Sequence, residues 1–261
     1  MTSTPDIGQS ENSAAANAAY FLEHLREYHD SVATIDTYRT LHDFISKEVE
    51  GVNELLDVGN GGVFAYDTSR VGSITAIDLF LEDLPPDIVE TYFPKNARAR
   101  QGSALALPEN DGTFDMVLMV MLLHHLTGPD WRSSWRNTCQ ALQEGWRVLK
   151  PGGRLLIVES CVPGWFFQLE KPALWVLSRS VKTIFSHPVT LQFPAVMIAD
   201  ELRKRFDVVQ VSAIPKGKFV LQFGIKMRSF LTPVMPFAFD AKKRGQGAAD
   251  KEVSLFGLVS P

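Results

Sequence analysis

Acidic side chains and clustered glycines mark one short stretch of this sequence as a candidate ligand-binding turn. The stretch "LLDVGNGGVFAY", residues 55–66, ends an apolar run in Asp57 and then places three glycines within four positions. Glycines let a backbone turn sharply and approach a ligand closely. Asp78 follows 19 residues after Gly59, close to the spacing of about 20 residues expected of an acid that binds ribose hydroxyls. The alternative is an ordinary turn, with Asp78 capping the next element.

The glycine spacing does not favour a dinucleotide. A pyrophosphate-binding turn has the pattern G-x-G-x-x-G, and "GNGGVF" has no third glycine at the required offset. Asp57 would also repel a neighbouring pyrophosphate, whereas it would attract an ammonium group. A ligand with ribose, adenine and an amino-acid tail therefore fits the pattern better than one with phosphates.

The elements around this turn alternate between strands and helices. Strands are expected in "NELLDVG", "SITAIDLF", "ARARQGSA", "TFDMVLMV" and "RLLIVES", with a long helix in "WRSSWRNTCQALQEGWRVLK". This alternation predicts an α/β fold with a parallel sheet covered on both faces, which binds ligands beyond the carboxyl ends of its strands. Two late strands are expected in "FDVVQVSAI" and "KEVSLFGLV". The aromatic segment "KFVLQFGIKMRSFLTPVMPFAF" between them is expected to close the far side, and "DAKKRGQGAADKE" to be a solvated loop.

The chain of 261 residues is long enough for one large domain. We expect a disordered leader at 1–17, with no secretory signal pattern, and one domain over 18–261. Within this domain, helices at 18–50 would cap the sheet. A largely helical insertion at 161–205 would form a lid, or else the contact surface of a homodimer.

Composition excludes several classes of protein. The net charge of −4 gives no basic footprint for nucleic acid. No apolar run reaches the about 20 residues of a membrane-spanning helix, so no membrane partner is expected. Two cysteines are too few for a disulfide framework, which fits a reducing cytoplasm.

Four blocks, in their order and spacing, resemble the class I methyltransferases that depend on S-adenosylmethionine. They are "LLDVGNGG", "ITAIDLF", "GSALALPENDGTFDMVLMVMLLHHL" and "ALQEGWRVLKPGGRLLIVES", and they span about residues 52–160. The resemblance implies a Rossmann-like fold. Its seven-stranded, mostly parallel sheet would have helices on both faces and an antiparallel last strand.

The resemblance also implies a set of cofactor-binding residues. The methionine part would lie near Asp57, Gly59, Asn60, Gly61 and Val120; the ribose and adenine would lie near Asp78, Leu79, Ser103 and Ala104. Two positions depart from the common family pattern: Val63 stands where many members have glycine, and Ser103 where many have aspartate. Because both acids at the strand ends remain, S-adenosylmethionine is still the expected cofactor.

Two histidines are candidate bases. Methyl transfer needs the nucleophile held in line with the S–CH3 bond, with water excluded, and a hydroxyl nucleophile must also lose its proton. His124 and His125 directly follow the fourth strand, where the family builds its acceptor site, and His124 is the favoured base of the two. The alternative is that both rings are structural.

Four further residues are candidates for binding the acceptor. Tyr28 lies in the first helical stretch, where it would contact the acceptor or else pack into an aromatic core face. Glu159 ends the fifth strand and could bind a polar acceptor or a cation, and the sequence leaves open whether a metal assists. Trp165 and Phe166 begin the insertion after that strand.

The function expected from these patterns is O-methylation of a small molecule, with a sugar or oligosaccharide hydroxyl or a secondary metabolite as acceptor. N- or C-methylation of a small natural product stays open, as does a relative that binds the cofactor without transferring its methyl group. The sequence does not name the acceptor.

Overall fold

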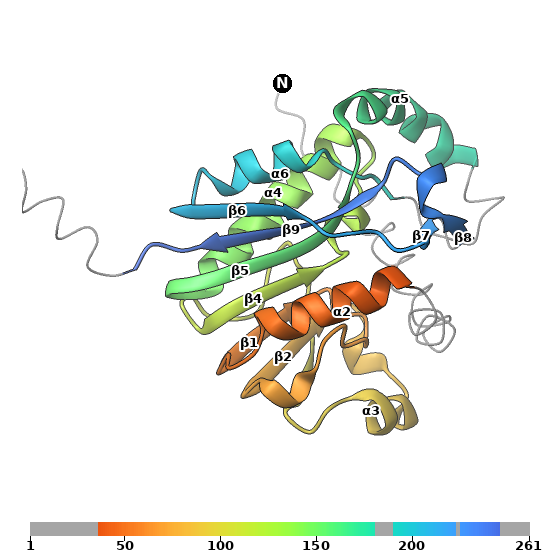
Figure 1. The fold of residues 1–261 in the computed structure, drawn as a ribbon. Coiled ribbons are helices and arrows are strands. Elements are labelled where there is room, and N and C mark those ends of the chain that lie inside the picture. The colour runs from red at the N-terminus through yellow and green to blue at the C-terminus, as the bar shows by residue number, and fades with distance from the viewer. Residues whose placement is uncertain (1–35, 181–189, 223–224, 246–261) are drawn as a thin grey trace, which may run out of the picture.

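The computed structural model describes residues 36–180, 190–222 and 225–245, and its centre is a seven-stranded sheet (Figure 1). The strands are β1 (Glu54–Val58), β2 (Ser73–Asp78), β3 (Ala97–Gln101), β4 (Phe114–Val120), β5 (Leu149–Cys161), β6 (Val208–Ala213) and β9 (Met235–Lys242). They lie in the order β3-β2-β1-β4-β5-β9-β6. Pairing is parallel from β3 through β5, whereas β9 runs antiparallel to both of its neighbours.

The strand order reverses direction at β1, which has β2 on one side and β4 on the other. In an open parallel sheet, such a switch point opens a crevice at the carboxyl ends of the strands. Asp57 is the penultimate residue of β1 and Asp78 the last residue of β2. Both predicted cofactor-binding acids therefore lie at this crevice.

Helices cover the two faces of the sheet, as the alternation of elements predicts. One face packs on α2 (Asp36–Glu48), and the other on α4 (Trp131–Val148) and α6 (Ala195–Leu202). Alternate strand residues supply the two cores because successive side chains of a strand point to opposite faces. In β1, Leu55 joins the α2 side and Leu56 the α4 side.

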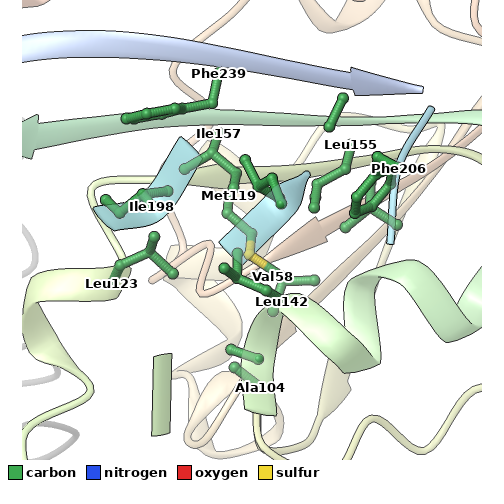
Figure 2. Close-up of a cluster of buried hydrophobic side chains, with 14 of the residues drawn as sticks. Val58, Ala104, Met119, Leu123, Leu142, Leu155, Ile157, Ile198, Phe206 and Phe239 are labelled. Atoms are coloured by element: carbon green, nitrogen blue, oxygen red, sulfur yellow. The ribbon is translucent and has the colours of Figure 1, made fainter. Parts of the chain in front are cut away.

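The core on the α4 side lies directly beneath the candidate site. Figure 2 shows part of it, with side chains from β4, β5 and β9 facing those of α4 and α6. Leu123, from the turn after β4, is buried in the same cluster. Burying a leucine side chain of this kind contributes about 2–3 kcal/mol, which anchors the turn that carries the two histidines.

The antiparallel strand implied by the resemblance is present, but it is formed by different residues from those expected. β9 occupies 235–242, across the end of the aromatic segment and the start of the expected solvated loop. The segment "KEVSLFGLV" lies outside the described residues. β9 is assigned by its pairing with β5 over Arg154–Cys161, a contact between distant segments that the local sequence pattern does not contain.

The remaining described elements lie at the site end of the sheet or along its edge. The helix α5 (Gly164–Ser180) and the hairpin of β7 (Phe219–Gln222) with β8 (Ile225–Arg228) lie at the end to which the parallel strands point (Figure 1). The short helix α3 (Pro86–Tyr92) lies beside β2. In the part of the chain that the structure describes, no helix is both long and apolar enough to cross a membrane.

The expected lid interval contains two different kinds of helix. α5 leaves the sheet after β5, whereas Ile198, Ala199 and Leu202 of α6 are at most 3% exposed within the main core. α6 is therefore a structural helix of the sheet. A lid function for α5 stays a prediction.

Candidate active site

The glycine turn after β1 is organised by side chains within the same stretch. Gly59, Gly61 and Gly62 have φ values of +71°, +62° and +79°, in the left-handed region that favours glycine. The Asn60 amide donates to Asp57 Oδ2 at 2.7 Å and to the Val63 carbonyl at 3.1 Å. Its Oδ1 accepts from Gly62 N–H. Asn60, predicted to contact the cofactor, thus also holds the turn together.

The two glycines predicted to contact the cofactor have different surroundings. A Cβ at Gly59 would lie 2.4 Å from Leu122 Cδ1, so the turn after β4 packs directly on this residue. A Cβ at Gly61 would have no atom within 4 Å. Gly61 therefore presents bare backbone to an open space, which fits a cradle for the methionine part of the cofactor.

Asp57 is buried at 3% exposure and has a second partner that the sequence analysis did not identify. Tyr66 Oη donates to Asp57 Oδ2 at 2.9 Å, the same oxygen that Asn60 contacts. Burial raises the pKa of Asp57 to about 7, an effect that the two hydrogen bonds oppose and that the nearby charge of Asp78 increases.

The Asp78 side chain connects the glycine turn after β1 to the backbone that follows β2. Its Oδ2 accepts from Gly61 N–H at 3.0 Å and its Oδ1 from Leu79 N–H at 2.6 Å. Burial raises its pKa to about 6, against the effect of these two bonds. Each carboxylate oxygen can accept a further hydrogen bond, so both are able to receive ribose hydroxyls as predicted.

The loop after β3 contacts the end of β2 at Asp78. Gly102 N–H donates to the Asp78 carbonyl at 2.9 Å, and Ser103 Oγ accepts from Leu105 N–H at 3.2 Å. Ala104 is 9% exposed and its side chain belongs to the core on the α4 side. Adenine contacts in this loop, if made as predicted, would therefore come from its backbone and from Ser103.

The strand β4 ends in a strained turn. Val120 packs against the α2-side core, and the next residue, Met121, has φ +51°. A non-glycine residue in this region is uncommon, and such strain often lies at functional sites. Met121 N–H donates to the Val158 carbonyl at 2.7 Å, which fixes the start of the turn against β5.

His124 and Glu159 form a close pair at this edge of the sheet. Nδ1 of His124 lies 2.6 Å from Glu159 Oε1, and the side chains are 12% and 2% exposed. Glu159 Oε2 accepts from Leu123 N–H at 2.6 Å, which ties the short helix η3 (Leu123–His125) to β5. Because a carboxylate only accepts, Nδ1 is the nitrogen that donates to Glu159, and in the neutral ring this tautomer leaves the lone pair on Nε2. This is the state that a general base needs.

The ring of His125 lies against the ring of His124. The two histidine rings are tilted by 40° with centroids 4.2 Å apart. The structure thus brings His124, the favoured candidate, together with Glu159, which sequence reasoning had assigned to binding the acceptor or a cation.

One further polar side chain next to this pair was missed from the sequence. Gln192 is 6% exposed, and its buried Oε1 has no hydrogen-bond partner among the residues that the structure describes. Its neighbours are fixed on both sides, because Leu191 N–H donates to the His124 carbonyl and the Phe193 carbonyl accepts from Val162 N–H. A buried polar atom without a partner is costly, which makes Gln192 a candidate for binding the acceptor.

The aromatic candidates differ in their surroundings. Trp165 is 64% exposed and contacts Phe166 edge to face, while Phe166 packs against the core. Phe167, which was not predicted as a site residue, is 2% exposed and packs on Trp131. The predicted residue Tyr28 lies outside the described residues. Within the described ranges, no group of three or more histidine, cysteine or acidic residues could hold a metal ion.

Comparison with known proteins addresses the fold and the class of chemistry. A family model described as a methyltransferase domain matches residues 56–157, which include the glycine turn, Asp78 and both histidines. Residues 56–157 therefore match the kind of methyltransferase domain that the four sequence blocks resemble.

Curated relatives match this chain over part of their length. The ubiquinone/menaquinone biosynthesis C-methyltransferase UbiE of Idiomarina loihiensis is 40% identical over 120 residues, which cover 42% of this chain and 43% of that protein. The chain spans less than half of the length of the curated relatives it matches.

Solved structures match the fold of this chain over nearly its whole length. The 1,6-didemethyltoxoflavin-N1-methyltransferase of Burkholderia thailandensis, solved with S-adenosylhomocysteine, has a TM-score of 0.59 at 16% identity, over 93% of each chain. The [4+2]-cyclase SpnF also has a TM-score of 0.59 at 16% identity, over 89% of this chain and 96% of that one. At this identity the likeness shows the fold alone, and the same fold is thus found in a protein described as a cyclase.

Proposed function

We propose that this methyltransferase transfers a methyl group from S-adenosylmethionine to a hydroxyl of a small molecule, either a sugar or a secondary metabolite. The observation that carries the proposal is the 2.6 Å contact between His124 Nδ1 and Glu159 Oε1 at the carboxyl edge of the sheet. A base held by a carboxylate is what a hydroxyl acceptor requires, because an un-ionised hydroxyl is a weak nucleophile.

The residues of the chain divide into two groups in this reaction. Asp57, Gly61 and Asp78 would hold the cofactor, which supplies an activated methyl group when bound. His124 Nε2 would accept the proton that the acceptor hydroxyl loses as its oxygen bonds to the methyl carbon. Glu159 would hold the ring in position and stabilise the imidazolium that results, through its contact with Nδ1.

Amine acceptors fit the site less well. A neutral amine attacks through its own lone pair and loses its proton afterwards, so it gains little from a positioned base. The toxoflavin enzyme is described as an N1-methyltransferase, but its likeness to this chain concerns the fold alone.

C-methylation is the second candidate, and the match to UbiE favours it. Removal of a proton from a ring hydroxyl makes the adjacent ring carbons nucleophilic, so the same histidine would serve this reaction. The two candidates differ in the product: O-methylation consumes the hydroxyl, whereas C-methylation leaves it in place.

Turnover of labelled cofactor tests the proposal. The purified protein would be given methyl-labelled S-adenosylmethionine with matched phenols, catechols, sugars and amines, and each product would be located by NMR. We expect an O-methyl product whose formation depends on His124. Transfer to amines alone, undiminished in His124→Ala, would overturn the proposal. Cofactor binding without transfer to any acceptor would indicate a non-catalytic relative, an alternative that the fold likeness to SpnF makes relevant.

The homodimer and the cytoplasmic location expected from the sequence are part of this proposal. Trp165 and Leu169 of α5 are 64% and 62% exposed, which supports either a lid or a contact surface. Light scattering of the purified protein would distinguish a dimer from a monomer.

A further inference from the structure

The Asp57 carboxylate is held by two donors that both contact the same oxygen. Asn60 Nδ2 lies 2.7 Å and Tyr66 Oη 2.9 Å from Oδ2. Tyr66 is itself 3% exposed and packs edge to face against Phe64, with ring centroids 6.2 Å apart. Its hydroxyl is therefore fixed in place by packing, and it reaches back nine positions to the acid that precedes the glycine turn.

The other oxygen of Asp57 is left for a ligand. Among the described residues, no side-chain hydrogen bond to Oδ1 accompanies the two to Oδ2. Asp57 follows Leu55 on the α2 side of β1, at the carboxyl edge where Gly61 offers open backbone. A carboxylate held by one oxygen in this way presents the other oxygen in a single direction.

Among the described residues, two titratable groups face Asp57. Tyr66 is one, and burial beside the acid raises its pKa well above the ordinary value, so that it stays a neutral donor. Asp78 is the other, and its charge adds to the effect of burial on the pKa of Asp57, which is raised to about 7. Asp57 is therefore much more readily protonated near neutral pH than an exposed aspartate.

We propose that Tyr66 is a positioning residue that keeps Asp57 Oδ1 turned toward the cationic amino-acid end of the cofactor, and that cofactor binding expels the Asp57 proton into solvent. The inference rests on the proposed binding of S-adenosylmethionine at this turn. The proton balance is simple: the ligand brings a cation, the acid loses H⁺, and the site keeps a carboxylate paired with that cation.

Proton release of this kind makes cofactor affinity depend on pH in a defined way. Below the pKa of Asp57, Kd should rise by up to about tenfold for each unit by which the pH falls. Above that pKa, Kd should not depend on pH. Tyr66→Phe removes a donor that favours the ionised acid. A hydrogen bond to a charged group corresponds to roughly one to two pKa units. The pH above which Kd is constant should therefore rise by about one to two units in the variant. At pH 9.5, where Asp57 should be mostly ionised in both proteins, the two should bind nearly alike.

Calorimetry tests the proposal directly. Binding would be measured with S-adenosylmethionine and S-adenosylhomocysteine from pH 5.5 to 9.5, in pairs of buffers with different ionisation enthalpies. At pH 6.5 the wild-type protein should release roughly three quarters of a proton, from a pKa of about 7. Asp57→Asn should release much less, and this variant also corrects for any proton that the ligand amine itself exchanges.

Three controls make the result specific. 5′-Methylthioadenosine lacks the amino-acid end, so its binding should release no Asp57 proton. Asp78→Asn should keep the step assigned to Asp57, moved slightly to lower pH because one negative charge is gone. Thermal unfolding of Tyr66→Phe without ligand would show whether the variant is folded.

Two outcomes would overturn the proposal: equal proton release by the wild type and Asp57→Asn, or a Tyr66→Phe variant that weakens binding equally at every pH. The second result would mean that Tyr66 is merely structural. Because the readout is binding and not turnover, a missing acceptor activity leaves the test intact. Failure of S-adenosylmethionine to bind at all would refute the proposed function as well.

Discussion

Replacing Glu159 with glutamine should separate the catalytic from the structural role of the histidine pair. Glu159 is 1% exposed and accepts four hydrogen bonds. The donors are Leu123 N–H, His124 Nδ1, Ser160 N–H and Ser160 Oγ–H, at 2.6, 2.6, 2.6 and 3.1 Å. Glutamine has one acceptor oxygen instead of two, so its amide NH2 must face at least one of these donors.

The cost to stability follows from that count. In either orientation of the amide, at least one buried N–H loses its acceptor, which costs about 1–3 kcal/mol of unfolding free energy. A matched control is Glu144→Gln on α4. Glu144 is also buried, and it accepts from Leu107 N–H at 2.8 Å and from Arg147. It should cost a similar amount of stability without affecting the reaction.

The effect on turnover is expected to be larger. If the amide NH2 faces His124, it donates to Nδ1, the ring proton moves to Nε2, and the base is lost. If the amide oxygen faces His124, the ring keeps its tautomer but loses the carboxylate that stabilises its cation. A positioned base supplies a factor of about 10²–10⁴, so kcat for a hydroxyl acceptor should fall by up to this factor in Glu159→Gln and by the full factor in His124→Ala.

The assay is turnover of labelled cofactor at saturating concentration, with denaturant unfolding and cofactor Kd measured on the same samples. An acidic phenol that is already ionised at the assay pH should lose much less rate than an aliphatic alcohol. Equal losses with both acceptors, or full turnover in Glu159→Gln and His124→Ala, would refute the reasoning. The pair would then be structural.

Three further predictions concern the cofactor crevice and its neighbour. Asp78→Ala should weaken the affinity for S-adenosylmethionine at least tenfold in calorimetry, since hydrogen bonds to a charged group are worth about 1.5–3 kcal/mol; unchanged affinity would exclude Asp78 as the ribose ligand. Gly59→Ala should lower the free energy of unfolding by more than Gly61→Ala. Alanine at positive φ costs about 1–2 kcal/mol at either position, but only the Cβ at Gly59 clashes with Leu122. A double-mutant cycle of Gly59→Ala with Leu122→Ala should therefore show a coupling energy of about 0.5–3 kcal/mol. Gln192→Leu should raise Tm, because it removes a buried oxygen that has no partner in the described part of the chain, and it should raise KM for the acceptor. A lowered Tm with unchanged KM would mean that the amide serves the fold.

The sequence was sufficient for the fold class and for the strand that carries each candidate acid. Asp57 and Asp78 lie at the carboxyl ends of the first two strands as predicted, because short apolar runs that alternate with helices have few arrangements other than a parallel sheet. The position of the two histidines just after the fourth strand was also predicted. The last strand was not, since β9 depends on its pairing with β5, and the segment itself reads equally well as an aromatic loop.

The partners of the candidate site residues were beyond the sequence. His124 and Glu159 are 35 positions apart, on elements that are adjacent only because β4 pairs with β5 in one register. Nor does any local pattern place the Tyr66 hydroxyl on Asp57, the turn after β4 on Gly59, or Gln192 next to the histidines. Residue types and spacing determined which groups stand at strand ends, since backbone periodicity is local. Only the tertiary structure decided which of them meet, because hydrogen bonds and steric contacts across elements depend on register and on packing between segments far apart in the chain.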